Sequence, residues 1–197
     1  MTPLTQVTGP AANLPLANLD TDIIFPARFL LITEKKGLGR YAFHDRADLA
    51  VPPGTEILIT GDNFGCGSSR EQAPWALADL GVRVLIATGF GEIFQSNCFK
   101  NGMLPIVLAD HEVVRLDTAA KSREAFTIDL VAQEIRLSQT GTFAFSIEPA
   151  RRESLLNGWD ETAGIRAGFG DAIAAFERKQ RAYAPWLWTA EQGLQNG

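Results

Sequence analysis

Short apolar runs alternate with a longer amphipathic stretch in the middle of the chain. The runs at residues 56–60, 82–88 and 104–108 are typical of buried strands, and glycine, proline or polar residues bound each of them. Between the first two runs, residues 69–80 carry an apolar stripe at helical spacing. A strand, a crossover helix and a second strand of these lengths predict neighbouring parallel strands.

The N-terminal segment is predicted to add two further strands. Val7 can begin the first, in a stretch that is otherwise polar and proline-containing. Residues 18–22 are rich in turn-forming types and lead into the apolar residues 23–25, which Pro26 ends. We therefore expect a strand at residues 23–25, followed over residues 34–49 by a charged, glycine-containing mobile loop that carries one short helix.

Other patterns complete the chain. Residues 92–94 predict a short helix, with a loop at residues 97–102, and Asp110 can cap a helix over residues 112–116. From Phe126 onwards the period becomes two, and a hairpin and one further strand are predicted. From residue 126 the predicted elements are strands at 126–130, 134–137 and 143–147. They are followed by helices at 148–157 and 170–181, which a glycine-containing segment joins.

These elements predict an α/β fold, with one domain over residues 1–150 and a C-terminal helical extension of it over residues 151–197. The net charge of −5 gives no electrostatic reason to expect nucleic acid or an anionic membrane as a partner. No apolar run approaches the roughly 20 residues that span a bilayer, and the N-terminus lacks the layout of a secretory signal. A cytoplasmic location is expected.

The metal-ligating residue types are few. Cys66 and Cys98 are the two cysteines, and His44 and His111 are the two histidines. Two thiols fit a reducing compartment and cannot complete a four-thiolate zinc site or an iron–sulfur ligand set. We expect no metal and no cofactor to be bound by this chain alone, so a metal centre needed for function would come from another chain.

Residues 61–71, Gly-Asp-Asn-Phe-Gly-Cys-Gly-Ser-Ser-Arg-Glu, are the most informative segment. They join a predicted strand to the amino end of a predicted helix, which offers free N–H groups and about half a positive charge to an anion. Three glycines let the backbone approach a ligand closely. Arg70 adds a planar, two-pronged carboxylate binder. The segment predicts a carboxylate site that holds the hydroxyls of Ser68 and Ser69.

Plainer interpretations stay open for several of these residues. Ser68 and Ser69 can simply cap the helix, since serine is a favoured N-cap residue. Cys66 is more typical of a small packing residue than of a ligand or nucleophile. Asp20 and Asp22 can close an Asx-turn or lie at an active site, and the sequence favours neither.

The chain resembles the small subunit of 3-isopropylmalate dehydratase (isopropylmalate isomerase), of the aconitase superfamily. The central signature is highly specific and runs from Asn63 to Leu77, with Gln72 where many members have histidine. The other similar segments are residues 18–26, residues 90–94 with Asn97, residues 101–105, and residues 171–177.

The resemblance implies a swivelling β/β/α domain that closes over a large subunit, and a [4Fe-4S] cluster that the larger chain holds. It implies interconversion of 2-isopropylmalate and 3-isopropylmalate, which are small di-acids, by dehydration and rehydration in leucine biosynthesis. By the same resemblance Ser68 is the catalytic base. Ser69 and Arg70 bind a substrate carboxylate, and Asp22 lies near the site.

Two departures from the family pattern leave the substrate open. Many members have lysine after the proline of the first motif, whereas this chain has Ala27 and then Arg28. The segment between Phe43 and Glu56 is also shorter than in many bacterial members. The loop from Leu30 to Tyr41 is the candidate for recognising the isopropyl group. The alternatives are a related hydro-lyase small subunit acting on dimethylmalate, citraconate or homoaconitate, and a non-catalytic carboxylate-binding protein.

Overall fold

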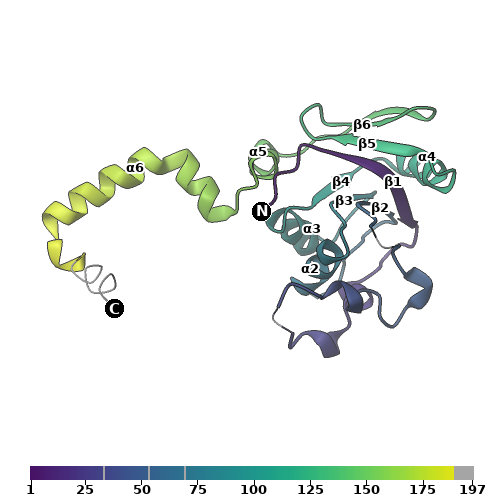
Figure 1. Ribbon diagram of the computed structural model, residues 1–197, viewed down its shortest axis with the longest axis horizontal. Helices are drawn as coiled ribbons and strands as arrows, with labels where there is room; N and C mark the ends of the chain where they lie inside the picture. The colour runs from purple at the N-terminus through teal and green to yellow at the C-terminus, as the bar shows by residue number, and fades with distance from the viewer. Residues whose placement is uncertain (33, 53, 69, 189–197) are drawn as a thin grey trace. The chain divides into compact units, whose positions relative to one another are not determined.

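The computed structural model describes residues 1–32, 34–52, 54–68 and 70–188. Contacts divide the chain into two units, Met1–Gly158 and Trp159–Gly197. The first unit is built on a seven-stranded sheet in the order β4-β3-β2-β1-β5-β6-β7 (Figure 1). The strands are β1 (Gln6–Leu14), β2 (Ile57–Thr60), β3 (Val84–Ala87), β4 (Leu104–Val107), β5 (Ala125–Asp129), β6 (Glu134–Leu137) and β7 (Gly141–Ala144). The predicted α/β class is confirmed.

Strand β1 joins a parallel half of the sheet to an antiparallel half. Its residues 6–10 pair antiparallel with β5, and its residues 11–14 pair parallel with β2. Strands β2, β3 and β4 are parallel, as their crossover lengths predict. Strands β5 and β6 form the predicted hairpin, and β7 extends it.

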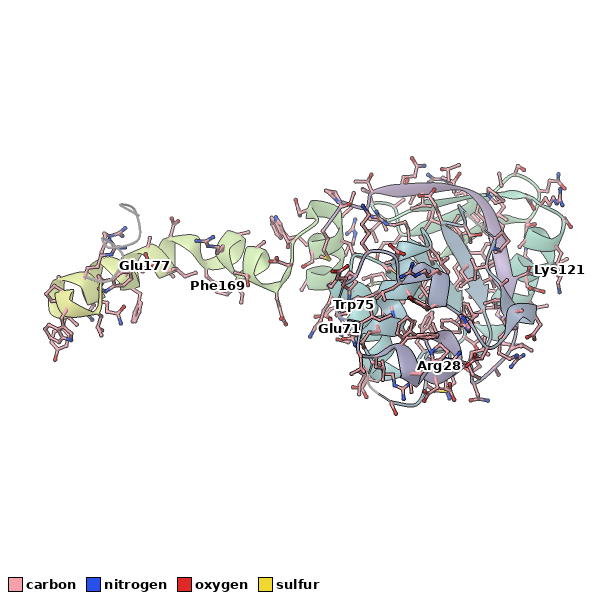
Figure 2. All side chains as sticks on the ribbon, turned by 60° about the horizontal axis from the view of Figure 1, so that its bottom comes forward. Arg28, Glu71, Trp75, Lys121, Phe169 and Glu177 are labelled. Atoms are coloured by element: carbon pink, nitrogen blue, oxygen red, sulfur yellow. The ribbon has the colours of Figure 1, made fainter. Side chains whose placement is uncertain are left out.

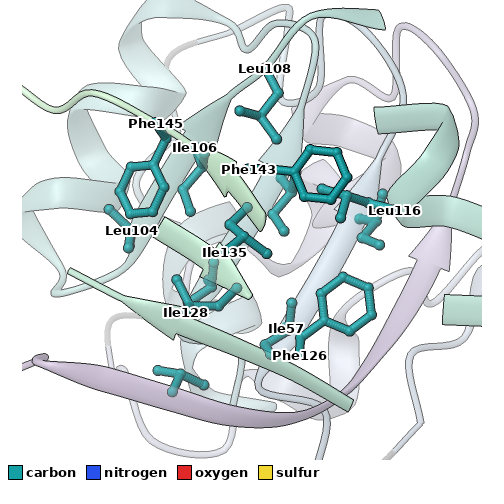
Figure 3. Close-up of a cluster of buried hydrophobic side chains, with 14 of the residues drawn as sticks. Ile57, Leu104, Ile106, Leu108, Leu116, Phe126, Ile128, Ile135, Phe143 and Phe145 are labelled. Atoms are coloured by element: carbon teal, nitrogen blue, oxygen red, sulfur yellow. The ribbon is translucent and has the colours of Figure 1, made fainter. Parts of the chain in front are cut away.

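Two hydrophobic clusters cover the two faces of the parallel half. Alternate side chains of a strand point to opposite faces, so Ile57 and Ile59 enter one cluster while Leu58 enters the other. The first cluster also includes side chains of strands β5–β7 and of two helices, at residues 110–121 and 149–157, and Figure 3 shows its aliphatic and phenyl side chains interleaved. The second cluster lies under the loops and helices that follow β1, β2 and β3.

The helices are α1 (Thr21–Ile24), α2 (Gln72–Asp79), α3 (Glu92–Lys100), α4 (Asp110–Lys121), α5 (Pro149–Asn157) and α6 (Glu161–Tyr183). Four short 3-10 turns lie at Ala27–Phe29, Gly39–Tyr41, Ala47–Leu49 and Pro185–Leu187. The strand predicted at residues 23–25 is wrong. The Asp20 carboxylate accepts a 2.8 Å hydrogen bond from the Ile23 N–H, and this cap begins a helical turn where the side chains favour a strand.

Other boundaries also differ from prediction, among them that of the strand predicted at residues 143–147, which is β7 at Gly141–Ala144. Helix α3 continues through residues 97–100, which were expected to be a loop, and it ends before Gly102 at φ +76°. The N-cap of α4 is Ala109 rather than Asp110, and Glu112 reaches back to accept from the Ala109 N–H at 3.1 Å. Helix α6 includes Gly164, which was assigned to a connecting segment.

The second unit consists mainly of α6. The Asp160 carboxylate caps it by accepting from the Ala163 N–H at 2.7 Å, and its backbone departs from helical angles at Phe169. None of the described residues of α6 is buried, and Figure 2 labels Phe169 and Glu177 along it. Within the described ranges, no helix combines the length and apolar character of a bilayer span. Helix α5 belongs to the first unit by its contacts. The division between the units therefore falls after Gly158, whereas the sequence was divided after residue 150.

Candidate active site

Three loops meet at the carboxyl edge of the parallel strands and enclose a cavity. They follow β1, β2 and β3, whose carboxyl ends lie at the same edge because the strands are parallel neighbours. The cavity has a volume of about 290 Å³. Its lining residues are Thr21, Asn63, Gly65, Cys66, Gly67, Ser68, Arg70, Gly91, Glu92, Ile93 and Phe94.

Main-chain hydrogen bonds tie the middle loop to the other two. The Gly65 N–H donates to the Leu19 carbonyl at 2.7 Å. On the other side, the Phe64 N–H donates to the Gly89 carbonyl at 3.1 Å, and the Gly91 N–H donates to the Phe64 carbonyl at 2.9 Å. The loop that carries Ser68 is therefore held from both flanks.

Two glycines are required where the loops approach most closely. Gly65 has φ +74°, and a Cβ placed on it would lie 2.2 Å from the buried ring of Phe94. A Cβ on Gly91 would lie 2.5 Å from the Gly65 carbonyl oxygen. Any side chain at either position would push the loops apart.

Ser68 is exposed and lines the cavity. Helix α2 begins at Gln72 and its N-cap residue is Glu71, so Ser68 stands outside the helix and does not cap it. Figure 2 labels Glu71 and Trp75, which mark the first turns of α2. Ser69 lies outside the described residues.

The helix whose amino end lines the cavity is α3. Gly91 is its N-cap residue, and Glu92, Ile93 and Phe94 form its first turn and line the cavity. The sequence predicts that the amino end of α2 meets the ligand. Helix α2 begins only at Gln72, two residues after Arg70. The amino end of α3, with the Glu92 carboxylate in its first turn, is therefore the helix end at the cavity.

Arg70 forms an ion pair with Asp22, across a sequence separation of 48 residues. The Arg70 side chain is 14% exposed and that of Asp22 is 50% exposed. Asp20 has a different role, because its carboxylate caps α1. The two aspartates thus have different roles. Asp20 caps α1, and Asp22 forms an ion pair with Arg70, which lines the cavity.

The two cysteines have different surroundings. Cys66 is partly exposed and lines the cavity, so it is not a core packing residue. Cys98 is buried, and that burial raises the pKa of its thiol well above the ordinary value. Across the part of the chain that the structure describes, no three histidine, cysteine, aspartate or glutamate side chains form a group that could hold a metal ion.

The loop from Leu30 to Tyr41 packs against α2. Its Gly39 N–H donates to the Asp79 carboxylate at 2.8 Å, and the Lys35 ammonium lies 4.5 Å from the centre of the Trp75 ring. Among the described lining residues of the cavity, none comes from this loop. A role for the loop in substrate choice stays a prediction.

Sequence reasoning did not assign five of the lining residues to the site. They are Thr21, Gly91, Glu92, Ile93 and Phe94. Glu92 and Ile93 follow the Gly-Phe-Gly turn at residues 89–91, and a glycine turn after a predicted strand is the signal that could have located them. Thr21 carries no comparable signal, because its role depends on a contact with a distant segment.

Comparisons with known proteins identify the family of this chain. Residues 50–111 match the Aconitase C-terminal domain, and residues 170–190 match the C-terminal domain of the 3-isopropylmalate dehydratase small subunit. The 3-isopropylmalate dehydratase small subunit of Ruegeria sp. (strain TM1040) is 46% identical, over 91% of this chain and 96% of its own length. The one from Rhodospirillum centenum is 45% identical, over 94% and 98%.

A solved structure is also similar. The crystal structure of 3-isopropylmalate dehydratase from Methanocaldococcus jannaschii superposes with a TM-score of 0.67 at 26% identity, and the match covers 87% of this chain and 99% of that one. The likeness in sequence extends over nearly the full length of these relatives. The chain therefore belongs to the family of 3-isopropylmalate dehydratase small subunits.

Proposed function

We propose that this chain is the small subunit of a two-subunit hydro-lyase that interconverts 2-isopropylmalate and 3-isopropylmalate in leucine biosynthesis. Family membership supports the reaction. The observation that carries the proposal is one cavity that holds both an exposed serine, Ser68, and a carboxylate-binding arginine, Arg70. A cytoplasmic location remains part of the proposal and is tested by cell fractionation.

In the proposed reaction Ser68 acts as the general base. Dehydration removes a proton from the carbon next to a carboxylate, which passes to Ser68, and a hydroxide ion from the neighbouring carbon, and it leaves an alkene di-acid; the proton and the hydroxide together make up the water lost. Rehydration returns the proton and the hydroxyl with their positions exchanged. Ser68 Oγ accepts the proton in the first half and donates it in the second. A serine oxygen takes this role only where positive potential stabilises its anion, and Arg70 and the amino end of α3 supply that potential.

Arg70 is proposed to hold a substrate carboxylate with its planar guanidinium, which offers two parallel N–H donors. The carboxylate then replaces or joins Asp22, the present partner of Arg70. Ser69 is proposed as a second carboxylate contact. Because developing charge on the substrate lies next to its carboxylate, these contacts strengthen as the proton leaves.

A large subunit is proposed as the partner, and it carries the [4Fe-4S] cluster. The two cysteines of this chain are too few for the ligand set of such a cluster. When bound, the cluster supplies a Lewis acid for the departing hydroxyl. This chain contributes the proton-transfer group and a carboxylate contact, so neither of the two proteins is expected to turn over substrate alone.

The test is turnover by the reconstituted pair of subunits, measured with 2-isopropylmalate and followed through absorbance of the alkene di-acid. Ser68→Ala should lower kcat by several orders of magnitude and leave the fold unchanged, because it removes the base. The matched control is Ser122→Ala, at the carboxyl end of α4, which should leave kcat unchanged. Full activity of Ser68→Ala would contradict the assigned role.

A substrate panel in the same assay distinguishes the alternatives. Faster turnover of dimethylmalate, citraconate or homoaconitate than of 2-isopropylmalate would replace the proposed substrate and keep the chemistry. Carboxylate binding without turnover by any reconstituted pair would replace the enzyme with a non-catalytic binding protein.

A further inference from the structure

Thr21 is bonded twice to the turn that carries Ser68. Its N–H donates to the Cys66 carbonyl at 2.9 Å, and its Oγ1 donates to the Ser68 carbonyl at 2.9 Å. The residue is 2% exposed although it lines the cavity. Its hydroxyl is therefore shielded from water and committed to a protein acceptor.

The turn between these two carbonyls is tightly constrained. Gly67 lies between them with φ +89°, a backbone conformation that side-chain-bearing residues rarely adopt. Asp20 and Cys66 also form an isolated parallel bridge. The turn after Cys66 is thus fastened to the start of α1, and the Thr21 hydroxyl is the side-chain contact that reaches Ser68 itself.

The bond to Thr21 also matters for the charge in the cavity. A carbonyl oxygen carries partial negative charge and would repel an incoming carboxylate or a serine oxygen that is losing its proton. The Thr21 hydroxyl donates to this oxygen and holds the Ser68 carbonyl in place. Without the hydroxyl, the Ser68 carbonyl loses this anchor, and the backbone that orients the Ser68 side chain is held less firmly.

We propose that Thr21 is a positioning residue for Ser68, and that its hydroxyl, rather than its bulk, sets the orientation of the base. This inference rests on the proposed function. Because a displacement of about 1 Å can cost about a hundredfold in rate, loss of the hydroxyl should act on kcat. The ion pair of Arg70 does not involve Thr21, so KM should change little.

The experiment uses Thr21→Val, which keeps the shape and removes the hydroxyl, and Thr21→Ser, which keeps the hydroxyl and removes the methyl group. The matched control is Thr55→Val. Thr55 is also buried, and its Oγ1 donates to the Pro52 carbonyl at 2.7 Å, at the opposite end of β2 from the cavity. Each variant is reconstituted with the large subunit and assayed with 2-isopropylmalate.

Thr21→Val should lower kcat about 10- to 100-fold with KM within about threefold, while Thr21→Ser and Thr55→Val should keep kcat within about threefold. Amide hydrogen exchange of the free chain gives a second readout. Exchange over residues 61–71 should accelerate in Thr21→Val only.

Unchanged kcat and unchanged exchange in Thr21→Val would overturn the inference. An equal loss of kcat in Thr21→Ser would also overturn it, because it would assign the effect to the methyl group. If the wild-type pair has no turnover of any malate-type acid, the proposed function fails, and the exchange measurement still decides whether Thr21 holds the turn.

Discussion

Gly65→Ala is the most direct test of how closely the cavity loops must approach. At φ +74° a Cβ is disfavoured by about 1–2 kcal/mol. The new Cβ would also lie 2.2–2.6 Å from three atoms of the Phe94 ring, which packs edge-on against the fully buried ring of Phe64. Overpacking of this kind typically costs about 1–3 kcal/mol. The total, about 2–5 kcal/mol, is a large part of a typical stability of about 5–15 kcal/mol.

The assay is thermal unfolding of the whole chain followed by circular dichroism. Gly65→Ala should lower Tm by about 4–20 °C. Gly54→Ala is the matched control, because Gly54 has φ +79° and no described heavy atom lies within 4 Å of the added Cβ. The Gly54→Ala variant has only the free-energy cost of placing a Cβ at positive φ, so its Tm should fall by about 2–8 °C. Equal losses in the two variants would refute the clash with Phe94 as the reason for glycine at this position.

Two further predictions concern charged groups. Arg70→Lys should raise KM about tenfold to a hundredfold, because a point charge replaces the planar guanidinium, and steady-state kinetics of the reconstituted pair would show this. An unchanged KM would count against carboxylate binding by Arg70. The hydrogen-bonded Arg28 guanidinium lowers the pKa of Asp45 from 3.8 to about 2. A carboxylate whose pKa falls on folding stabilises the fold above its unfolded pKa, and this contribution is lost as the pH falls through the folded pKa. The Tm difference between wild type and Asp45→Asn should therefore be constant above about pH 5 and shrink towards pH 2; a difference that persists unchanged at pH 2 would contradict the ion pair.

The strands of the first unit were largely predictable because buried strands require recognisable patterns of apolar residues. Every residue of β2 and β3 is buried, and an apolar run bounded by polar residues is what such strands require. The β5–β6 hairpin has one buried face and the matching alternation. Prediction failed at residues 23–25, where apolar side chains favour a strand but the cap from Asp20 begins a helix instead. A single local hydrogen bond outweighs weak strand propensity over so short a segment.

At the site, the sequence indicates residue types better than their arrangement. Ser68 and Arg70 were identifiable because hydroxyl, guanidinium and glycine in one loop suit a carboxylate ligand. The serines were expected at the start of α2, but the helix begins later, at Gln72, and α3 presents its amino end to the cavity. Of the two partners of the loop, Asp22 was named through the family resemblance and Thr21 was not named, because each bond joins segments nearly fifty residues apart.

The double pairing of β1 has a consequence for biosynthesis. Within the sheet β1 is first in sequence order, and its partners follow it: β2 begins at residue 57 and β5 at residue 125. Before those residues are synthesised, β1 has no partner in this sheet for its N–H and C=O groups, and unpaired groups of this kind can pair with other strands. The central strand of the finished sheet is therefore complete only after the antiparallel hairpin has been synthesised.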